Sequence, residues 1–405
     1  MDVDIRLVAE EEFPAWIRAI EAAFHYVPKD EDIAMERSVA ELDRSLVAMD
    51  GPQMVGATAA YSLRLTVPGG IIPMAGVTAV GVRPTHRRRG ILTALMQRQL
   101  SDVRERGEAV AGLWASEGSI YGRFGYGVAA LSASFEIQRD RSIFARPHRS
   151  GGTITLVDRE SAMKAMPGVY ERLRPKQPGM LGRNGSWWEY RFGDLKDWRD
   201  GATEFFFALH RAEEGVDGYV AYRVKHDWKG LPKSVVQVRE ILATSAETYA
   251  DLWRYCFDVD LIDTIETWGR PADEPLLFMV AEPRRLGLKL SDGLWVRLVD
   301  VAGALAARRY REDGRLILEV RDGFLPENEG RYELQGGPDG AECGSSRAEP
   351  DLVLGADDLG ATYLGGVRFS TLARAGRVYE RTDGAIARAD AMFGWDPLPW
   401  CPHVF

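Results

Sequence analysis

The sequence predicts an α/β (or α+β) protein made of two or three consecutive domains. Three observations favour this fold class. A chain of 405 residues is too long for one ordinary hydrophobic core. One order of strands and helices runs through residues 3–139 and recurs over residues 153–268, and the pattern changes after residues 270–271. Hydrophobic content of 45% and charged content of 27% are typical of a globular protein in water.

The first section alternates strand and helix signals. Its predicted elements, in order, are a strand at 3–8, an amphipathic helix at 10–24, a polar helix and loop at 25–44, strands at 45–50, 55–67 and 71–82, a helix that starts at 91, a strand at 108–114, a glycine-rich turn with a short helix at 116–127, and a strand pair at 128–139.

The stretch from Val77 to Gly107 joins a strand to a helix through a basic turn, Arg87-Arg88-Arg89-Gly90. The first N–H groups of a helix lack internal partners, and the helix dipole favours an anion there. Gly90 permits close backbone approach, and arginines add charge-assisted hydrogen bonds. The turn is therefore a candidate phosphate site, although a solvated basic turn before an ordinary helix has the same composition.

A second informative stretch follows the strand at 108–114. Residues 115–127 contain four glycines, which argue against a long helix, together with Ser116, Tyr121 and Tyr126. Functional groups often lie in such loops, and aromatic packing in a glycine-rich turn produces the same pattern.

Both stretches resemble motifs of a known family. Arg87-Arg88-Arg89-Gly90-Ile91-Leu92 is similar to the acetyl-CoA motif Q/R-x-x-G-x-G/A of the GCN5-related N-acetyltransferases (GNAT). Leu92 stands where the general motif has a small residue, a departure tolerated in the enhanced intracellular survival (Eis) branch. The residues from Ser116 to Gly127 closely resemble the Eis signature S-E-G-x-I-Y-G-R-F-G-Y-G, at the expected distance after the arginine motif.

The resemblance implies tandem GNAT domains, each a mixed sheet with helices on both faces, followed by an α+β domain similar to sterol carrier protein. The expected boundaries are 1–148 for the catalytic GNAT domain, 149–285 for a degenerate GNAT domain and 286–405 for the C-terminal domain with its tail. The second domain lacks a counterpart of the arginine motif, so we expect it to hold no cofactor. A fold does not fix a function, so a lipid-carrying role does not follow for the third domain.

The resemblance also assigns roles. Tyr121 matches the general acid, and Phe405, the last residue, matches the terminal carboxylate that serves as general base. The residues expected to hold acetyl-CoA are Val80, Val82, Arg87, Arg88, Gly90, Ile91 and Ser116. No metal is expected in the mechanism.

The acceptor implied by the family is a small-molecule amine, above all a polycation such as an aminoglycoside. By position, candidates for cation binding are Asp30, Glu31, Asp32 and Glu36, which are also typical of a solvated helix face. A protein-lysine acetyltransferase and a non-enzymatic lipid or ligand carrier remain as alternatives. The family also implies a homo-hexamer.

Composition excludes other classes. A net charge of −9 disfavours non-specific nucleic-acid binding. There is neither a long uncharged apolar run nor an apolar signal segment, so we expect a cytoplasmic protein without membrane partners. Cys256, Cys343 and Cys401 are too far apart for a metal-ligand pattern and are expected to be ordinary thiols.

Overall fold

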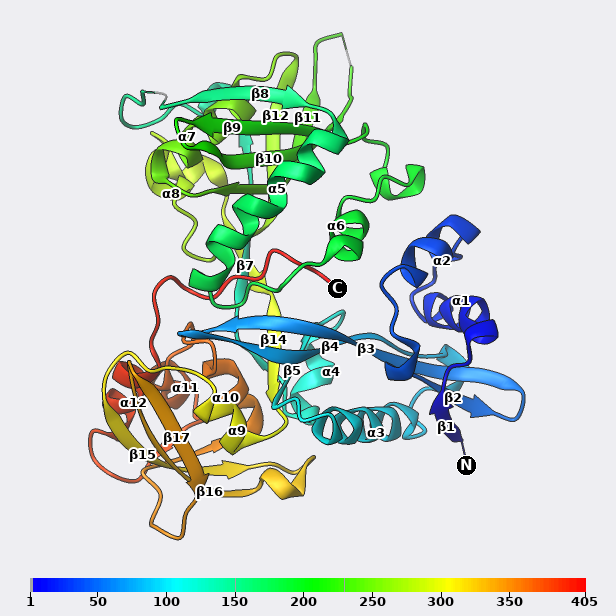
Figure 1. Cartoon of the computed structure of the whole chain (residues 1–405), viewed down its shortest axis with the longest axis vertical. Coiled ribbons are helices and arrows are strands. Elements are labelled where there is room, and N and C mark those ends of the chain that lie inside the picture. Colours follow the sequence, from blue (N-terminus) through cyan, green and yellow to red (C-terminus); the bar gives the residue numbers. More distant parts are fainter. Residues whose placement is uncertain (1–2, 150, 229) are drawn as a thin grey trace.

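In the computed structural model, residues 3–149, 151–228 and 230–405 are described, and they form three β-sheets with helices packed against them (Figure 1). The first sheet (blue to cyan) lies between the second (green) and the third (yellow to orange). None of the helices in this described part has the length and apolar character that crossing a membrane requires. The α/β class predicted from the sequence is therefore confirmed.

The first sheet has the strand order β1-β2-β3-β4-β5-β14-β6. Its strands are β1 (Asp4–Leu7), β2 (Ser45–Asp50), β3 (Gln53–Val67), β4 (Gly70–Val82), β5 (Val110–Trp114), β6 (Gly127–Val128) and β14 (Leu294–Leu298). Strands β4 and β5 are parallel, and the other neighbours pair in antiparallel fashion, so the sheet is mixed.

Helices cover both faces of this sheet: α1 (Phe13–Ala23) and α2 (Asp30–Arg37) lie on one face and α3 (Ile91–Glu105) on the other (Figure 1). Alternate residues of β2 divide between the two layers. Val47 packs in the cluster of α1, whereas Leu46 and Ala48 pack with the start of α3. This follows from the period of two along a strand.

The second sheet has the order β8-β9-β10-β11-β12-β7-β13, which repeats the plan of the first. Its strands are β7 (Leu131–Gln138), β8 (Thr153–Val157), β9 (Phe206–Ala212), β10 (Gly215–Lys225), β11 (Ser234–Ala243), β12 (Ile262–Arg270) and β13 (Lys289–Asp292), with helices α5 (Arg159–Leu173), α6 (Gly185–Arg191), α7 (Ala246–Asp258) and α8 (Leu276–Met279). Strands β11 and β12 are parallel, as β4 and β5 are, and each such pair is joined through a helix.

Two strands belong to sheets other than those predicted. Residues 128–139 were expected to complete the first sheet, but β7 pairs with β12 and β13 of the second. Strand β14 was expected in the C-terminal domain, but it pairs with β5 and β6 of the first sheet. An alternating apolar pattern predicts a half-buried strand without naming its partner, and that is why the sequence misassigned both.

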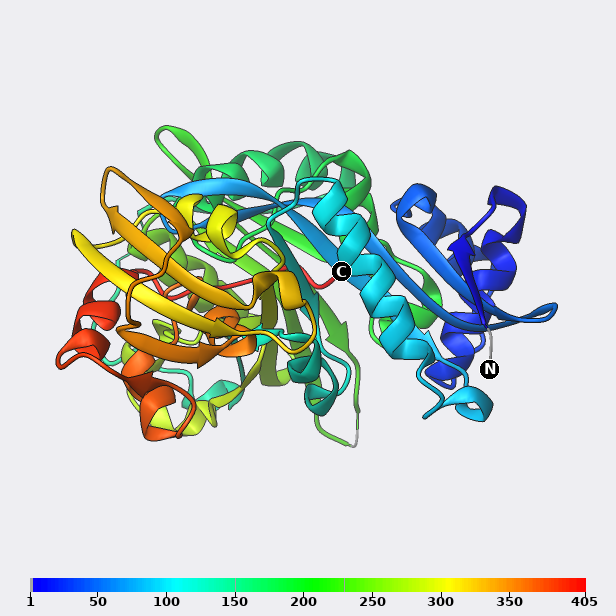
Figure 2. The ribbon, with the colours of Figure 1, turned by 90° about the horizontal axis from the view of Figure 1, so that it is seen from below.

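The third sheet has the order β17-β16-β15-β18-β19. Its elements are α9 (Val301–Ala306), β15 (Gly314–Arg321), β16 (Gly330–Gly337), β17 (Gly340–Ser345), β18 (Leu352–Gly355), α10 (Ala356–Thr362), α11 (Phe369–Arg374), β19 (Tyr379–Glu380) and α12 (Ala385–Phe393). After α12 the chain returns as an extended tail that ends near the middle of the molecule in both views (Figures 1 and 2). The tail places the C-terminus between the first and second sheets.

Candidate active site

A cavity of about 690 Å³ lies beside β4 and the start of α3 in the first sheet. It is lined by all the residues that the sequence predicts for the cofactor, together with Tyr121: Val80, Val82, Arg87, Arg88, Gly90, Ile91 and Ser116. The structure thus brings together a strand, a basic turn and a glycine-rich loop that are separate in the sequence.

A bulge in β4 forms one wall of this cavity. Opposite β3, Ala57 faces Gly81 and Ala59 faces Thr78, so Ala79 and Val80 together oppose a single residue. Ala79 has a φ of 54°, in the left-handed region. A bulge removes backbone groups from the regular ladder, and Val80 is such a residue on the cavity wall. The bulge therefore places the Val80 backbone at this cavity.

The basic turn opens directly into α3. Gly90, the residue before the helix, has a φ of 82°, and no side chain caps the first turn of α3. The first N–H groups of this helix are therefore left for a ligand. The Arg87 guanidinium donates to the Ala23 carbonyl at 3.3 Å, which joins the turn to the end of α1. The arrangement suits the phosphates of a nucleotide-containing cofactor.

Tyr121 ends the short helix α4 (Gly118–Tyr121) and is 4% exposed. Burial raises the pKa of its phenol, and a hydrogen bond with the Ser116 side chain opposes that rise. The phenol therefore keeps its proton at neutral pH and is available as an acid. The neighbouring Tyr126 is fully buried, with its ring centre 6.1 Å from that of Tyr121, and supports it by packing.

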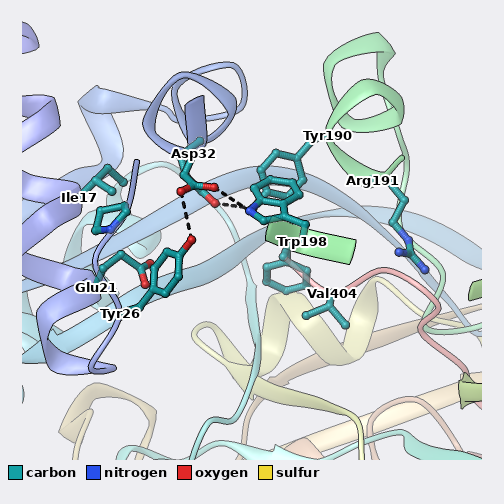
Figure 3. Close-up of a pocket in the computed structure, with 11 residues that line it drawn as sticks. Ile17, Glu21, Tyr26, Asp32, Tyr190, Arg191, Trp198 and Val404 are labelled. Carbon is teal, nitrogen blue, oxygen red and sulfur yellow. Dashed lines mark hydrogen bonds between the residues drawn. The ribbon is translucent and has the colours of Figure 1, made fainter. Parts of the chain in front are cut away.

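Phe405 lines a second cavity, of about 420 Å³. Figure 3 shows this cavity with Ile17 and Glu21 of α1 at its wall. Ile17 and Glu21 of α1 line this second cavity, whereas Ala23, just after them, lines the first. The Phe405 ring lies against Gly76 of β4, since a Cβ there would be 3.0 Å from its Cε2 atom. The Phe405 ring thus contacts the strand that carries Val80, but Phe405 does not line the cavity that Tyr121 lines.

The second cavity is acidic, and we call it the acidic cavity. Asp32 accepts hydrogen bonds from the Tyr26 hydroxyl at 3.1 Å and from Trp198 Nε1 at 2.8 Å (Figure 3). Glu36 accepts one from the Tyr190 hydroxyl at 2.5 Å. The Lys29 backbone N–H also donates to Asp32, at 2.8 Å, so Asp32 accepts three hydrogen bonds while it lines the cavity with Glu36.

The acidic residues predicted from position divide in two. Asp32 and Glu36 line the acidic cavity, whereas Asp30 pairs with Arg18 at 3.0 Å and Glu31 is an exposed residue outside the lining. The sequence prediction missed Glu21. Its spacing of four residues from the inward-facing Ile17 was the available signal, because such residues share a helix face.

Burial and mutual repulsion raise the pKa values of two carboxyl groups of this cavity. Desolvation raises the pKa of Glu36, against the opposing hydrogen bond from Tyr190. Desolvation also raises the pKa of Glu21, and the nearby Asp32 adds to the effect. The positive charge of a cationic ligand would offset both effects by attraction, so the cavity is better suited to a cation than to a neutral molecule.

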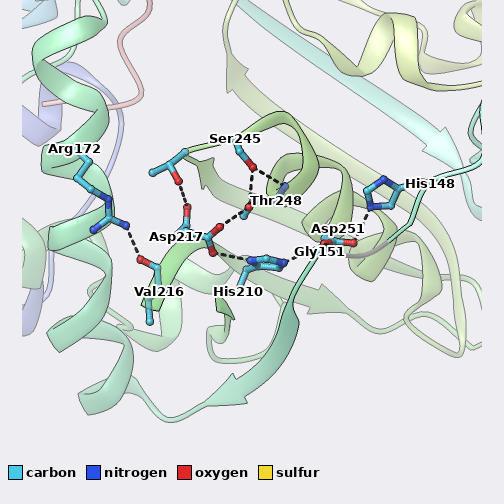
Figure 4. A network of polar contacts seen from close by, with 10 residues as sticks. His148, Gly151, Arg172, His210, Val216, Asp217, Ser245, Thr248 and Asp251 are labelled. Carbon is cyan, nitrogen blue, oxygen red and sulfur yellow. Dashed lines mark hydrogen bonds and ion pairs between the residues drawn. The ribbon is translucent and has the colours of Figure 1, made fainter. Parts of the chain in front are cut away.

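A separate polar cluster lies in the second sheet (Figure 4). Both ring nitrogens of His210 face carboxylates, Asp217 at 2.6 Å and Asp251 at 3.0 Å, and His148 reaches Asp251 at 2.7 Å. The Thr248 hydroxyl donates to Asp217 at 2.6 Å. The residues of this cluster bond to one another and attach the segment at His148 to α7. We therefore assign the cluster a structural role.

In residues 3–149, 151–228 and 230–405, no group of three or more His, Cys, Asp or Glu side chains is arranged to hold a metal ion. The three cysteines are free thiols, with Cys256 and Cys401 buried.

Comparison with known families agrees with this geometry. The model of the acetyltransferase (GNAT) domain matches residues 4–129, a second such model matches residues 179–298, and the model of the sterol carrier protein domain matches residues 301–402. Each GNAT match falls mainly on one of the first two sheets, and the sterol carrier protein match falls on the third.

Full-length relatives give the same result. The chain is 41% identical over 417 residues to an uncharacterized N-acetyltransferase of Streptomyces coelicolor, with 100% of both chains covered. It is 34% identical over 413 residues to N-acetyltransferase Eis of Mycobacterium tuberculosis, with 98% of both covered.

Among solved structures, Eis1 from Mycobacterium abscessus matches with a TM-score of 0.86 and 36% identity, over 99% of this chain and 100% of that one. Two GNAT domains, a sterol carrier protein domain and full-length identity above 30% identify the family. The chain belongs to the Eis-like GNAT N-acetyltransferases, which depend on acetyl-CoA.

Proposed function

We propose that this acetyltransferase acetylates primary amines of polycationic small molecules such as aminoglycosides. The observation that carries the proposal is the acidic cavity, which Glu21, Asp32 and Glu36 line together with the C-terminal residue and a single arginine, Arg191. Carboxylates in a partly buried cavity attract ammonium groups more strongly than exposed ones do, because the local dielectric is lower. A molecule with several amines satisfies several carboxylates at once.

Acetyl-CoA supplies an acetyl group activated as a thioester. Its phosphates would accept hydrogen bonds from the first N–H groups of α3 after Gly90 and from Arg88 and Arg87. The Val80 N–H, at the bulge of β4, would donate to the thioester carbonyl oxygen as negative charge develops there. Val82, Ile91 and Ser116 would complete the wall against which the cofactor lies.

Two groups of the chain would move the protons. The Phe405 carboxylate, directly or through water, takes the proton that the attacking amine loses. Tyr121 Oη gives its proton to the departing sulfur, so that CoA leaves as a thiol. The new bond joins nitrogen to the acetyl carbon, and the carbon–sulfur bond breaks. Phe405 ends protonated and Tyr121 ionised, and exchange with solvent resets both.

The test is CoA-thiol release from acetyl-CoA with a panel of aminoglycosides and lysine peptides. The intact protein is compared with a variant lacking Phe405 and with Tyr121→Ala. We expect turnover of aminoglycosides that falls about 100-fold or more in both variants, the usual range for loss of an acid or base. Preference for lysine peptides would favour the protein-lysine alternative. Absence of turnover from a folded protein would favour the carrier alternative.

We also propose that the chain assembles with copies of itself, as the family resemblance implies for a hexamer. Large apolar side chains are exposed on the second sheet and its loops: Ile143 is 66% exposed, Phe278 82% and Leu231 70%. Ile143 and Phe278 lie in segments that hydrogen bond to each other, through the Ala281 N–H and the Ile143 carbonyl. Light scattering after size-exclusion chromatography measures the number of copies.

A further inference from the structure

Each of the two GNAT domains contains one parallel strand pair that separates partway along its length. In the first sheet, β4 pairs with β5 only at Ala75 and Gly76, before the bulge at Val80. In the second sheet, β11 pairs with β12 as far as Val238, and a register shift against β10 adds one extra residue at Arg239. Both sheets therefore open a gap beside a bulge, at equivalent positions.

The two gaps have different contents. The first leads to the cavity of about 690 Å³ that the cofactor residues line. The second holds an enclosed space of about 10 Å³ between Arg191, Glu240 and Trp400, and a cavity of about 320 Å³, lined by Leu242, Arg270 and Trp400, opens beside it. The freed Arg239 carbonyl accepts a hydrogen bond from Arg191 at 3.0 Å, and Glu240 accepts bonds from Arg183 at 2.8 Å and Tyr219 at 2.6 Å.

Trp400 of the C-terminal tail lines both of these spaces in the second domain. Its Nε1 atom donates to the Gly269 carbonyl of β12 at 2.7 Å, and its backbone N–H donates to the Pro178 carbonyl at 2.8 Å. The Arg270 guanidinium lies 5.1 Å from the ring centre. A buried tryptophan with its N–H satisfied is an efficient anchor, because it combines large apolar burial with a directional bond.

Beyond Trp400 the tail crosses to the first sheet. Trp114, the last residue of β5, donates from Nε1 to the His403 carbonyl at 3.0 Å. The His403 ring meets the edge of Trp187 at 4.8 Å between centres, and Phe405 lies against Gly76 of β4. The tail therefore joins the gap of the second domain to the gap of the first, and its last residue, Phe405, lines the acidic cavity.

We propose that the strand gap of the second GNAT domain is the receptor for the C-terminal tail, and that Trp400, seated in it, is a positioning residue for the Phe405 carboxylate. The inference rests on the proposed function, since it takes that carboxylate as the base. A free tail visits many conformations, and a base acts efficiently only when it is held within reach of its proton. The second domain supplies that restraint.

The test uses the full-length protein with Trp400→Ala, Trp400→Phe and a matched control, Trp395→Ala. Trp395 belongs to the same tail but lies against the C-terminal domain, where its backbone N–H donates to the Gly365 carbonyl. The first readout is independent of activity: carboxypeptidase Y releases C-terminal residues from a free tail and not from a buried one. We expect rapid release from Trp400→Ala and slow release from the intact protein and from Trp395→Ala.

The second readout is steady-state kinetics with the aminoglycoside turned over best by the intact protein. We expect kcat of Trp400→Ala to fall about 10-fold or more, as for a misplaced catalytic group, with KM for acetyl-CoA unchanged. Removing Phe405 as well should lower kcat no further than its removal alone, because both changes act on one carboxylate. Trp400→Phe keeps a ring in the gap, so its kcat should lie between those of the intact protein and Trp400→Ala. This variant preserves the test if the alanine variant does not fold.

Three outcomes overturn the inference: a tail still protected in Trp400→Ala, a freed tail with normal kcat, or losses in kcat that multiply in the double variant. If removal of Phe405 alone leaves kcat unchanged, the proposed base is wrong. The carboxypeptidase readout then still decides whether the second domain holds the tail.

Discussion

Replacing Glu36 by glutamine separates the charge of the acidic cavity from its shape. Glu36 is half-buried, and its carboxylate accepts a hydrogen bond from the Tyr190 hydroxyl at 2.5 Å. A glutamine carbonyl can accept the same bond, so the packing at Tyr190 should persist. The negative charge that would bind an ammonium group of the acceptor is lost. The change therefore tests whether the cavity recognises cations.

The expected loss follows from the type of contact. A hydrogen bond that involves a charged group contributes about 1.5–3 kcal/mol. At 1.4 kcal/mol for each factor of ten, KM for a polycationic acceptor should rise roughly 10- to 150-fold. KM for acetyl-CoA should stay unchanged, because Glu36 lines the acidic cavity and not the cavity beside β4.

The same substitution should stabilise the protein at neutral pH. Burial raises the pKa of Glu36 above its value in the unfolded chain, so the folded state holds this proton more tightly. The stability gained from protonation is fully present below the unfolded pKa, about 4.3, and is lost as pH rises through the folded pKa. Glutamine carries no charge at any pH. The variant should therefore have the higher Tm at pH 7.5, and the difference should shrink toward zero near pH 4.

The assay is CoA-thiol release with a polycationic aminoglycoside at pH 7.5, together with thermal unfolding at several pH values. Glu31→Gln is the control, since Glu31 is exposed on the same helix and does not line the acidic cavity. An acceptor KM within about twofold of the Glu31→Gln value would refute the cation site. A lower Tm at neutral pH would refute the assignment of an unfavourable buried charge.

Three further predictions follow from the site and the fold. Tyr121→Phe should lower kcat about 100-fold and remove the alkaline limb of the kcat–pH profile. Because burial raises the pKa of Tyr121, that limb should lie above the ordinary tyrosine pKa in the intact protein. An unchanged profile would contradict the acid role. Arg88→Ala should raise KM for acetyl-CoA about 10-fold, measured at saturating acceptor, with kcat nearly constant. Gly127→Ala should destabilise the protein by about 3 kcal/mol or more in urea unfolding, because the added Cβ would lie 1.9 Å from the Asp357 carbonyl oxygen. Gly185→Ala is the control and should leave stability unchanged, because a Cβ there meets no atom within 4 Å.

Local signals allowed much of the first domain to be predicted. The basic turn before α3 was found because a strand, a glycine and an apolar helical stripe lie in unbroken order, and the structure brings those residues to one cavity. The bulge at Ala79–Val80 has no such signal. It contains no glycine at the left-handed position, and its form is imposed by pairing with β3.

The acidic cavity was predicted only in part, because its walls come from distant parts of the chain. Tyr190 and Trp198 belong to the second domain, Glu21 to α1, and Phe405 to the end of the tail. No periodicity relates these positions. The exchange of β7 and β14 between sheets has the same origin, since strand pairing is decided by three-dimensional packing. The domain boundaries at 148/149 and 285/286 stay a prediction, and the exchanged strands lie on either side of them.

The strand exchange ties the second domain to the first. Because β7 crosses into the second sheet and β14 returns to the first, each sheet is completed by a strand from beyond its own segment. The chain passes between the sheets through short connections, residues 129–130 and 293, which restrict rigid-body movement between the two sheets. A tail held at Gly269 in one sheet and at Trp114 in the other therefore spans a fixed distance. A gap that holds the tail then contributes to catalysis through position, by holding a base from the far end of the chain against the first domain.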